Sequence, residues 1–450
     1  MAAECLKILD DRHTTQWARI IKTTFSLGFG PEVINEAWDT VFTALLKKKP
    51  SIATPSQTRT ITSLAITRKV AVLAAISVQP EAFHIEMNQF ARAEYSCTDF
   101  TQLHQLATEK AKEFGMPLYF FIGDIRKAYD HMDHQTLIQC LTRRRIYRST
   151  IGLWIGQLRK TSEIARLSDL ESQPFHRQVS VYQGGNEGPL LFNIYFDDGI
   201  RDMLKRWKQK GWGLLYSDRD SGMEDVYLAL TSFADNFVLY SNNAQDLQEM
   251  LDGLITTLAG INWSVSVDSM LYGVIGAASK PPMQVDGTTI NAMTRDATYT
   301  LTGVKFNMST NTTDMFHHRL SCLTRSFYSM KPWWLAKHGA PVAERLGLLQ
   351  KLALSMLTQP LAIAQCLKTQ LDLVDKKQDE LQLFVVGLKR LRGENFINFN
   401  IRRYRHMRQI VAHLRVQPWS SKILCAYHTR AATVLSLIHI SEPTRRTPIS

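Results

Sequence analysis

Two stretches of the chain place carboxylates directly beside strand-forming runs. In the first, apolar residues 117–122 predict a buried strand that delivers Asp124 at its end, and Asp130 and Asp133 follow before a predicted helix. A carboxylate at the end of a buried strand is costly unless a cation meets it. An acid there, with an aromatic residue five positions later, suits a divalent metal ion that carries phosphates. The alternative is the acidic first turn of a surface helix.

The second stretch, residues 226–241, contains two β-rich runs around Ala234, Asp235 and Asn236. Asp and Asn tolerate the left-handed backbone of tight hairpin turns, so we expect Asp235 at a hairpin tip; an ordinary turn is the alternative. Between the two stretches, residues 181–196 combine a glycine-rich loop with an apolar helix. Glycines let a backbone approach a ligand closely, although any loop before a helix can show this pattern.

In this order, the three stretches resemble motifs A, B and C of reverse transcriptases, most closely those of non-LTR retrotransposons. The residues that match are Phe121, Asp124, Lys127, Ala128, Tyr129, Asp130 and His134 in motif A, Gln183, Gly184 and 189–193 in motif B, and Phe233, Ala234 and Asp235 in motif C. Asn236 departs from the family pattern, which has a second aspartate at this position.

The resemblance implies a catalytic centre for nucleotidyl transfer, which uses two divalent metal ions about 4 Å apart. Asp124 and Asp235 would bridge Mg²⁺ or Mn²⁺, and the backbone carbonyl of Ile125 could add a ligand. Asn236 would complete the catalytic set, because an amide oxygen can ligate a hard cation. One negative charge is nevertheless lost relative to the family.

The resemblance also implies which residues bind the incoming nucleotide. Tyr129 would lie under the sugar, where a ring clashes with a ribose 2′-hydroxyl and so selects deoxynucleotides. Gln183 and Gly184 would line the pocket beside the template base. Arg59 and Lys69 would meet the triphosphate or the template, because basic side chains neutralise phosphates. Solvated surface charge is the alternative for Lys69.

Three further segments extend the resemblance. Residues 260–270 fall where the family carries motif D, but they lack the lysine usual there. Residues 299–306 resemble the element that grips the primer end, with Leu301 and Gly303 as the gripping residues. Near the C-terminus, basic residues alternate with aromatic residues, which favours a nucleic-acid surface over plain solvated charge. The basic residues assigned to this surface are Arg402, Arg403 and Arg405.

Composition agrees with a nucleic-acid partner. The 450 residues carry a net charge of +12, which favours a polyanion such as nucleic acid or an anionic membrane surface. No apolar run approaches the roughly 20 residues of a membrane helix, and the N-terminus lacks a signal-peptide pattern, so no membrane partner is expected. The six cysteines are scattered without paired spacing. This argues against a zinc knuckle or disulfide framework and favours a reducing compartment, nucleus or cytoplasm.

The expected fold class is α/β (α+β): a right-hand polymerase with an antiparallel-sheet palm, fingers and a helical thumb. We expect an N-terminal helical segment at 1–45, fingers at 46–116, a palm at 117–308, and a helical thumb with a basic C-terminal region at 309–436. Residues 437–450 resemble a peptide translated from sequencing-adapter DNA, so we expect a non-native tail and exclude it.

The resemblance implies an RNA-directed DNA polymerase of a non-LTR retrotransposon, with an RNA template, a DNA primer or target and dNTPs as partners. Two alternatives accompany this interpretation, and the first belongs to another functional class. Asn236 and the missing motif D lysine leave open a decayed protein that only binds RNA or DNA. A host telomerase-like or maturase protein is the third interpretation, which no segment of the sequence supports.

Overall fold

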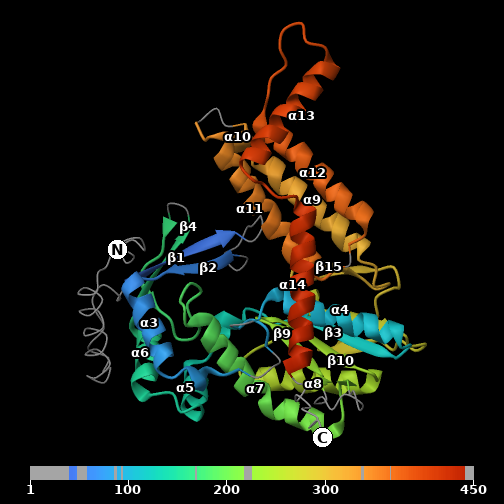
Figure 1. The fold of residues 1–450 in the computed structure, drawn as a ribbon. Coiled ribbons are helices and arrows are strands. Elements are labelled where there is room, and N and C mark those ends of the chain that lie inside the picture. The colour runs from blue at the N-terminus through green and yellow to red at the C-terminus, as the bar shows by residue number, and fades with distance from the viewer. Residues whose placement is uncertain are drawn as a thin grey trace, which may run out of the picture. The chain divides into compact units, whose positions relative to one another are not determined.

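The computed structural model describes residues 40–47, 58–85, 89–92, 95–167, 170–216, 226–335, 339–364 and 366–440 (Figure 1). The side chains of 47, 59, 67, 216, 226 and 431–440 are outside this description. The described chain divides into two compact units. The first comprises the described residues up to Cys97 together with 117–214 and 227–292, and the second comprises the described parts of 98–116, 215–226 and 293–440.

The first unit contains an antiparallel sheet of order β11-β3-β10-β9. Its strands are β3 (Leu118–Asp124), β9 (Leu230–Phe233), β10 (Asn236–Ser241) and β11 (Leu271–Ile275). The first six residues of β3 are buried and only Asp124 is half-exposed. This confirms the predicted buried strand that ends in an acid. The register pairs Asn236 with Asp124 and Phe237 with Gly123.

Two glycines let aromatic rings lie across this sheet. A Cβ on Gly123 would overlap the ring of Phe237, and a Cβ on Gly273 would overlap the ring of Phe120. Each ring belongs to the residue directly opposite its glycine on the neighbouring strand. Covering a strand glycine with a cross-strand aromatic ring restores the packing that the missing side chain would provide. The residue immediately before Asp124 is therefore held by packing.

A second sheet in the first unit has the order β2-β1-β4-β5, with β6 also paired to β4. Its strands are β1 (Thr40–Lys47), β2 (Thr58–Ser63), β4 (Ser162–Leu167), β5 (Leu170–Glu171) and β6 (Phe175–His176). The predicted helix over 1–45 is wrong for residues 40–45, because β1 pairs on both edges and buries alternate side chains, Val41 and Thr43. Residues 1–39 lie outside the described residues.

Helices flank both sheets of the first unit (Figure 1). They are α3 (Ile66–Val78), α5 (His134–Arg143), α6 (Arg148–Lys160), α7 (Gly188–Lys210) and α8 (Ala244–Gly260), with short turns η3 (Pro80–Phe83), η4 (Ala128–His131) and η5 (Val267–Ser269). The remaining strands of this part of the chain are β7 (Leu214–Tyr216), β8 (Val226–Leu228), β12 (Met283–Val285) and β13 (Thr288–Ile290). The helix predicted near Asp133 is confirmed. Asp133 caps α5 by accepting a hydrogen bond from the Thr136 N–H at 2.6 Å.

The second unit is mainly helical. It contains α4 (Cys97–Glu113), the hairpin β14 (Thr298–Leu301) and β15 (Val304–Asn307), α9 (Thr313–Ser329), α10 (Lys331–Trp334), α11 (Val342–Leu361), α12 (Lys368–Val386), α13 (Phe396–His413) and α14 (Trp419–Ile440). α11 packs against α9, α12 and α14. The apolar stripe predicted over 345–354 is confirmed as core, since Leu346, Leu349 and Ala353 are buried.

Two findings bear on the composition-based expectations. Within the described ranges, no helix is both long enough and apolar enough to span a bilayer. Five cysteines belong to these ranges, and all five are free thiols: Cys97, Cys140, Cys322, Cys366 and Cys425. Residues 437–440 end α14 and 441–450 lie outside the described chain.

Candidate active site

The two predicted metal-binding carboxylates come together at one end of the four-stranded sheet. Asp124 is the last residue of β3, and Asp235 lies in the turn that joins β9 to β10. The Ile125 N–H donates to the Asp235 carbonyl at 2.8 Å, which ties the two segments through their backbones. Both carboxylates line the same cavity. The structure therefore places Asp124, Ile125, Asp235 and Asn236 next to one another, with Asp124 and Asp235 lining the cavity.

The hairpin turn has a different conformation from the one expected. Ala234 takes the left-handed backbone, with φ of 53°, whereas Asn236 already belongs to β10. Gln89 holds this turn, because its side-chain oxygen accepts from the Ala234 N–H at 3.1 Å. The strain of a non-glycine residue at positive φ is thus offset by a tertiary contact. The Asn236 amide lies 3.4 Å from an Asp235 carboxylate oxygen, as its hydrogen-bond donor.

A third segment fixes the backbone on the other side of Asp124. The Ser266 N–H donates to the Asp124 carbonyl at 2.9 Å, and the Arg126 N–H donates to the Ser264 carbonyl at 2.8 Å. Residues 260–270, the segment expected to correspond to motif D, therefore lie directly beside the end of β3. A carboxylate whose main chain is hydrogen-bonded on both sides has little freedom to move.

The cavity at this site has a volume of about 580 Å³, within the size range of small-molecule sites. Its walls come from β2, β3, η4, the glycine-rich loop and the β9–β10 turn. The lining residues are Thr58, Thr60, Ile61, Asp124, Lys127, Ala128, Tyr129, Asp130, Tyr182, Gln183, Gly184, Gly185, Pro189 and Asp235. Tyr129, Gln183 and Gly184 thus share one cavity with both carboxylates, and their roles toward a nucleotide stay a prediction.

Tyr129 is half-buried beside the acids. Burial, and then the negative charge of Asp235, raise the pKa of Tyr129 to about 12. Its hydroxyl therefore stays protonated at neutral pH, and the residue acts through its ring and a neutral O–H group.

The glycine-rich loop is pressed against β2. The Thr62 N–H donates to the Gln183 carbonyl at 2.8 Å. Gly184 has φ of 131°, and a Cβ built on it would overlap the Thr62 carbonyl oxygen. Only glycine avoids both the unfavourable backbone conformation and the overlap. This loop is therefore held at the cavity by backbone contact with the N-terminal sheet.

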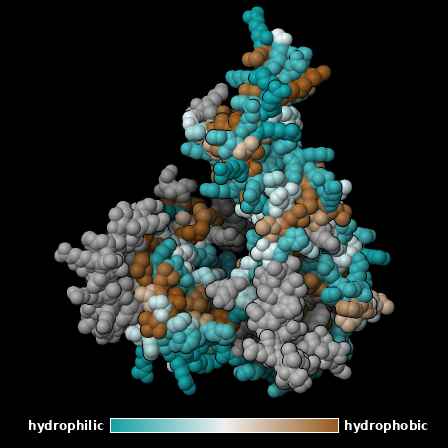
Figure 2. Space-filling view, in the orientation of Figure 1, coloured by the Kyte–Doolittle hydropathy of each residue, from teal (hydrophilic) through white to brown (hydrophobic). Residues whose placement is uncertain are grey.

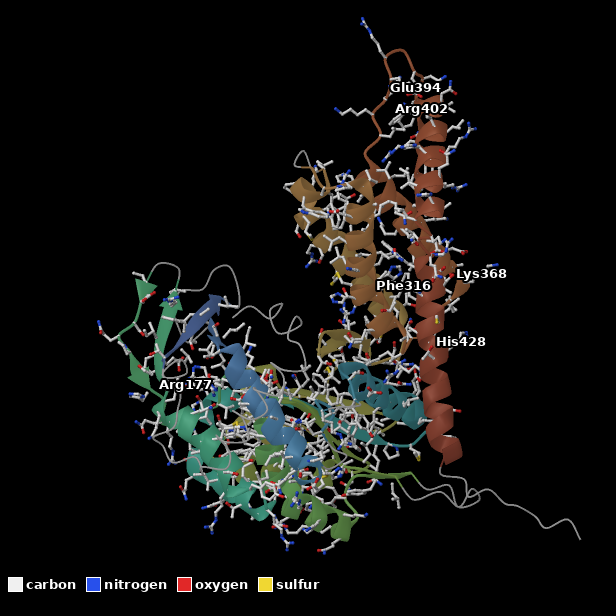
Figure 3. All side chains as sticks on the ribbon, turned by 60° about the vertical axis from the view of Figure 1, so that its left-hand side comes forward. Arg177, Phe316, Lys368, Glu394, Arg402 and His428 are labelled. Carbon is white, nitrogen blue, oxygen red and sulfur yellow. The ribbon has the colours of Figure 1, made fainter. Side chains whose placement is uncertain are left out.

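Buried charges lie behind the loop. Arg68 donates to Glu187 at 3.1 Å, and their side chains are 1% and 2% exposed. Two guanidinium groups contact the Tyr182 ring: that of Arg68 lies 4.9 Å from the ring centroid and that of Arg177 lies 5.1 Å from it. Arg177, which is labelled in Figure 3, in turn forms an ion pair with Glu163. Desolvation by burial lowers the pKa of Arg68 despite its pairing with Glu187.

Several predicted residues are not among the described residues that line this cavity, including Ile125 and Asn236 beside the two carboxylates. Lys69 lies on α3, half-buried, and is not among the described lining residues. Arg59 belongs to β2, but its side chain lies outside the described part of the chain. Leu301 and Gly303 belong to the β14–β15 hairpin of the second unit, where Gly303 turns with φ of 82°.

The basic C-terminal residues differ from one another. Arg402 donates to both carboxylate oxygens of Glu394, each at 2.7 Å, and to the Lys389 carbonyl (Figure 3). This hydrogen bonding lowers the pKa of Glu394 to about 2. Arg402 therefore holds a loop against α13, contrary to the expectation of an available cation. The Arg405 side chain is exposed, and hydrophobic patches interrupt the hydrophilic surface around α13 (Figure 2).

Lys127 is a site residue that the motif comparison matched but assigned no role. It is the single cationic side chain among the described residues that line the cavity. Its backbone is left-handed, with φ of 46°, and its carbonyl accepts from the Asp130 N–H at 2.8 Å to start η4. The signal was present in the spacing, three residues after Asp124, but only the fold shows that its side chain lines the same cavity as the carboxylates.

The ligand atoms at this site suit a hard divalent cation, although the ligand set carries one negative charge fewer than in the family. Carboxylate oxygens of Asp124 and Asp235 and the amide oxygen of Asn236 are the hard ligands that Mg²⁺ and Mn²⁺ prefer. Across the described ranges, no group of three or more His, Cys, Asp or Glu side chains is arranged to hold a metal ion. A metal ion would therefore be held mainly by the two aspartates, with Asn236 as a neutral third donor.

Comparison with known proteins agrees with this geometry. Residues 46–268 match the profile of the family described as reverse transcriptase (RNA-dependent DNA polymerase). The matched range contains all the lining residues of the cavity. No curated protein matches the chain.

Among solved structures, the chain is similar to telomerases. Apo telomerase from Candida tropicalis truncated from its C-terminal domain shares 12% identity over 66% of this chain and 60% of its own, with a TM-score of 0.39. Apo telomerase from the same organism shares 12% identity over 95% of this chain and 72% of its own, with a TM-score of 0.43. Telomerase from Candida albicans, in complex with a fragment of telomeric RNA, shares 10% identity over 93% of this chain and 68% of its own, with a TM-score of 0.37. This chain thus spans about 60% of the length of the first of these structures.

Proposed function

We propose that the reverse transcriptase domain at residues 46–268 of this chain, which has the fold of a right-hand polymerase, catalyses RNA-templated DNA synthesis. In this proposal the β11-β3-β10-β9 sheet belongs to the palm, the β1–β2 region to the fingers, and the helices after residue 309 to the thumb. The observation that carries the proposal is the cavity where Asp124 and Asp235 meet Tyr129 and Gln183.

The residues of the cavity and two neighbours of its carboxylates, Ile125 and Asn236, have distinct roles in this proposal. Asp124 and Asp235, with the Ile125 carbonyl and Asn236, would hold Mg²⁺ or Mn²⁺. Bound metal ions would stabilise the charge that develops on the attacking 3′-oxygen and the leaving pyrophosphate. Lys127 would bind the phosphates as a point charge. The Tyr129 ring would exclude a 2′-hydroxyl, so that deoxynucleotides are used.

The biological context is also a proposal. The motif spacing supports a non-LTR retrotransposon, with priming from the 3′-end of a DNA target inside a reducing compartment, the nucleus or cytoplasm. Leu301 and Gly303 would hold the primer end. Arg402, Arg403 and Arg405 would contact nucleic acid. Arg59 and Lys69 would act from the fingers.

Asn236 supports one competing function, a decayed polymerase that only binds nucleic acid. The test is primer extension by the chain with an RNA template, a DNA primer, dNTPs and Mg²⁺ or Mn²⁺. We expect extension that Asp124→Ala abolishes and that Asp202→Ala preserves. Asp202 is a matched control, because it is an 84% exposed aspartate on α7.

The outcomes separate the two functions. Extension only after Asn236→Asp would identify a decayed polymerase with an intact fold. If neither the parent chain nor Asn236→Asp extends the primer, and RNA binding weakens steeply as salt rises, the binding function is favoured and the enzyme assignment is refuted.

A further inference from the structure

Three aromatic rings form a column behind one wall of the cavity. The Tyr129 ring stacks on Phe192, with centroids 5.1 Å apart and an interplanar angle of 12°. Phe192 stacks on Trp263 at 5.2 Å and 20°. The rings come from η4, from α7 and from the segment that follows α8. Stacked rings at these separations attract one another beyond the effect of burial alone.

Only one end of the column reaches the cavity. Tyr129 is among the lining residues, whereas Phe192 and Trp263 are 0% and 2% exposed. Protein interiors are packed at crystal-like density, so a ring cannot shift unless its neighbours yield. Tyr129 therefore cannot retreat from the cavity along the stack without displacing Phe192 and then Trp263.

The segment that carries Trp263 is held by two helices and leads directly to the catalytic strand. The backbone N–H of Trp263 donates to the Leu258 carbonyl of α8 at 2.9 Å, and the Tyr195 hydroxyl of α7 donates to the Ile261 carbonyl at 2.7 Å. The next residues, 264–266, carry the backbone hydrogen bonds to Asp124 and Arg126. The base of the column and the metal-binding strand are thus parts of one hydrogen-bonded framework.

We infer that Trp263, acting through Phe192, is a positioning residue that sets the depth of the Tyr129 ring in the cavity and thereby the preference for deoxynucleotides over ribonucleotides. The inference rests on the proposed function. Trp263 is not among the described residues that line the cavity, so it acts without touching substrate. Loss of its ring would let Tyr129 sink and make room for a 2′-hydroxyl.

An ordinary core role makes a different prediction. A ring that only stabilises the fold would affect the use of dNTP and rNTP equally when it is truncated. The readout is therefore the ratio of kcat/KM for a dNTP to that for the matching rNTP, which general damage to the enzyme does not change. The measurement uses the full chain in primer extension, with Asn236→Asp as the background if only that chain extends.

Trp263→Leu should lower this ratio about tenfold, the rate equivalent of roughly one lost stacking contact. Phe192→Leu, which breaks the same column from α7, should lower it similarly and keeps the test open if Trp263→Leu does not fold. Trp263→Phe, which keeps a ring, should retain most of the ratio. Phe120→Leu is the matched control, a fully buried ring of β3 outside the column, and should leave the ratio unchanged.

A double variant tests whether the effect passes through Tyr129. Tyr129→Ala should itself lower the ratio, and adding Trp263→Leu should then lower it no further. The inference would be overturned, and the proposed function left standing, by either of two results. One is an unchanged ratio in both Trp263→Leu and Phe192→Leu. The other is that Trp263→Leu lowers the ratio as much in the Tyr129→Ala background as in the parent chain. Absence of extension by both parent chains would instead refute the proposed function, and the inference with it.

Discussion

The buried ion pair between Arg68 and Glu187 allows a quantitative prediction. The pair joins α3 to the residue just before α7, and both side chains are almost fully buried. Within the described residues, Nε and Nη1 of Arg68 have no hydrogen-bond partner, so the pair is only partly satisfied. Replacing Arg68 by Met leaves the Glu187 carboxylate buried without its counter-charge. Such a change costs about 3–5 kcal/mol of unfolding free energy.

The double variant Arg68→Met/Glu187→Leu should recover most of this loss. Replacing a whole buried pair by apolar side chains of similar volume is often neutral, because the desolvation of both charges is removed together. We expect the double variant to lie within about 1 kcal/mol of the parent. The difference between single and double variants then measures the penalty of the unpaired charge, and not the loss of packing volume.

The assay is urea unfolding followed by tryptophan fluorescence, with the thermal midpoint as a second readout. For a unit of this size, 3–5 kcal/mol corresponds to a fall in Tm of about 6–20 °C. Lys205→Met is the control, since its pair with Asp202 is largely exposed and should change stability by less than about 0.5 kcal/mol. If Arg68→Met cost under about 1 kcal/mol, or the double variant lost as much as the single one, the reasoning from buried charge would be refuted.

Three further changes have defined outcomes. Gly184→Ala should cost about 1–3 kcal/mol of unfolding free energy, because alanine is strained at this positive φ and overlaps Thr62. It should also lower kcat/KM for a dNTP about 100-fold, because the loop is displaced. A variant with parental stability and activity would contradict this prediction. Asn236→Asp should lower the Mg²⁺ concentration for half-maximal extension about tenfold, because it adds a carboxylate to the metal site. EDTA should abolish extension by both the parent chain and this variant. An unchanged Mg²⁺ requirement in the variant would contradict the prediction. Burial lowers the pKa of His104 to about 3 in the folded protein. Unfolding restores the ordinary value of about 6.5, so His104 takes up a proton on unfolding below that pH. The unfolding free energy should therefore fall by ~2 kcal/mol between pH 7 and pH 5. His104→Gln should remove this component in urea titrations, and an equal pH dependence in both chains would show that His104 is not its source.

The local elements of the site and of α11 in the second unit were predictable because their signals lie within short windows. The buried run before Asp124, the hairpin around Asp235 and the apolar stripe of α11 each follow from periodicity and burial of adjacent residues. The Asp133 cap of α5 is equally local. The order of the three motifs along the chain then predicts that Asp124 and Asp235 share one site.

The errors share one physical cause, competition from distant partners. Residues 40–45 form a strand because β4, more than 100 positions away, supplies an edge for pairing. Ala234 takes the left-handed turn position because Gln89, 145 residues earlier, holds it there. A single sequence window cannot contain these contacts.

The sequence by itself determined the residue types that can do the chemistry: two aspartates beside strands, an aromatic ring five residues after the first, and a glycine loop between them. Only the tertiary structure decided how they are held. Glu187 finds Arg68 across 119 residues, and Trp263 supports Tyr129 through Phe192 from a segment more than 130 residues away. These partners are chosen by burial, since a buried charge or ring is stable only beside a matching group. That match exists only once the chain is folded.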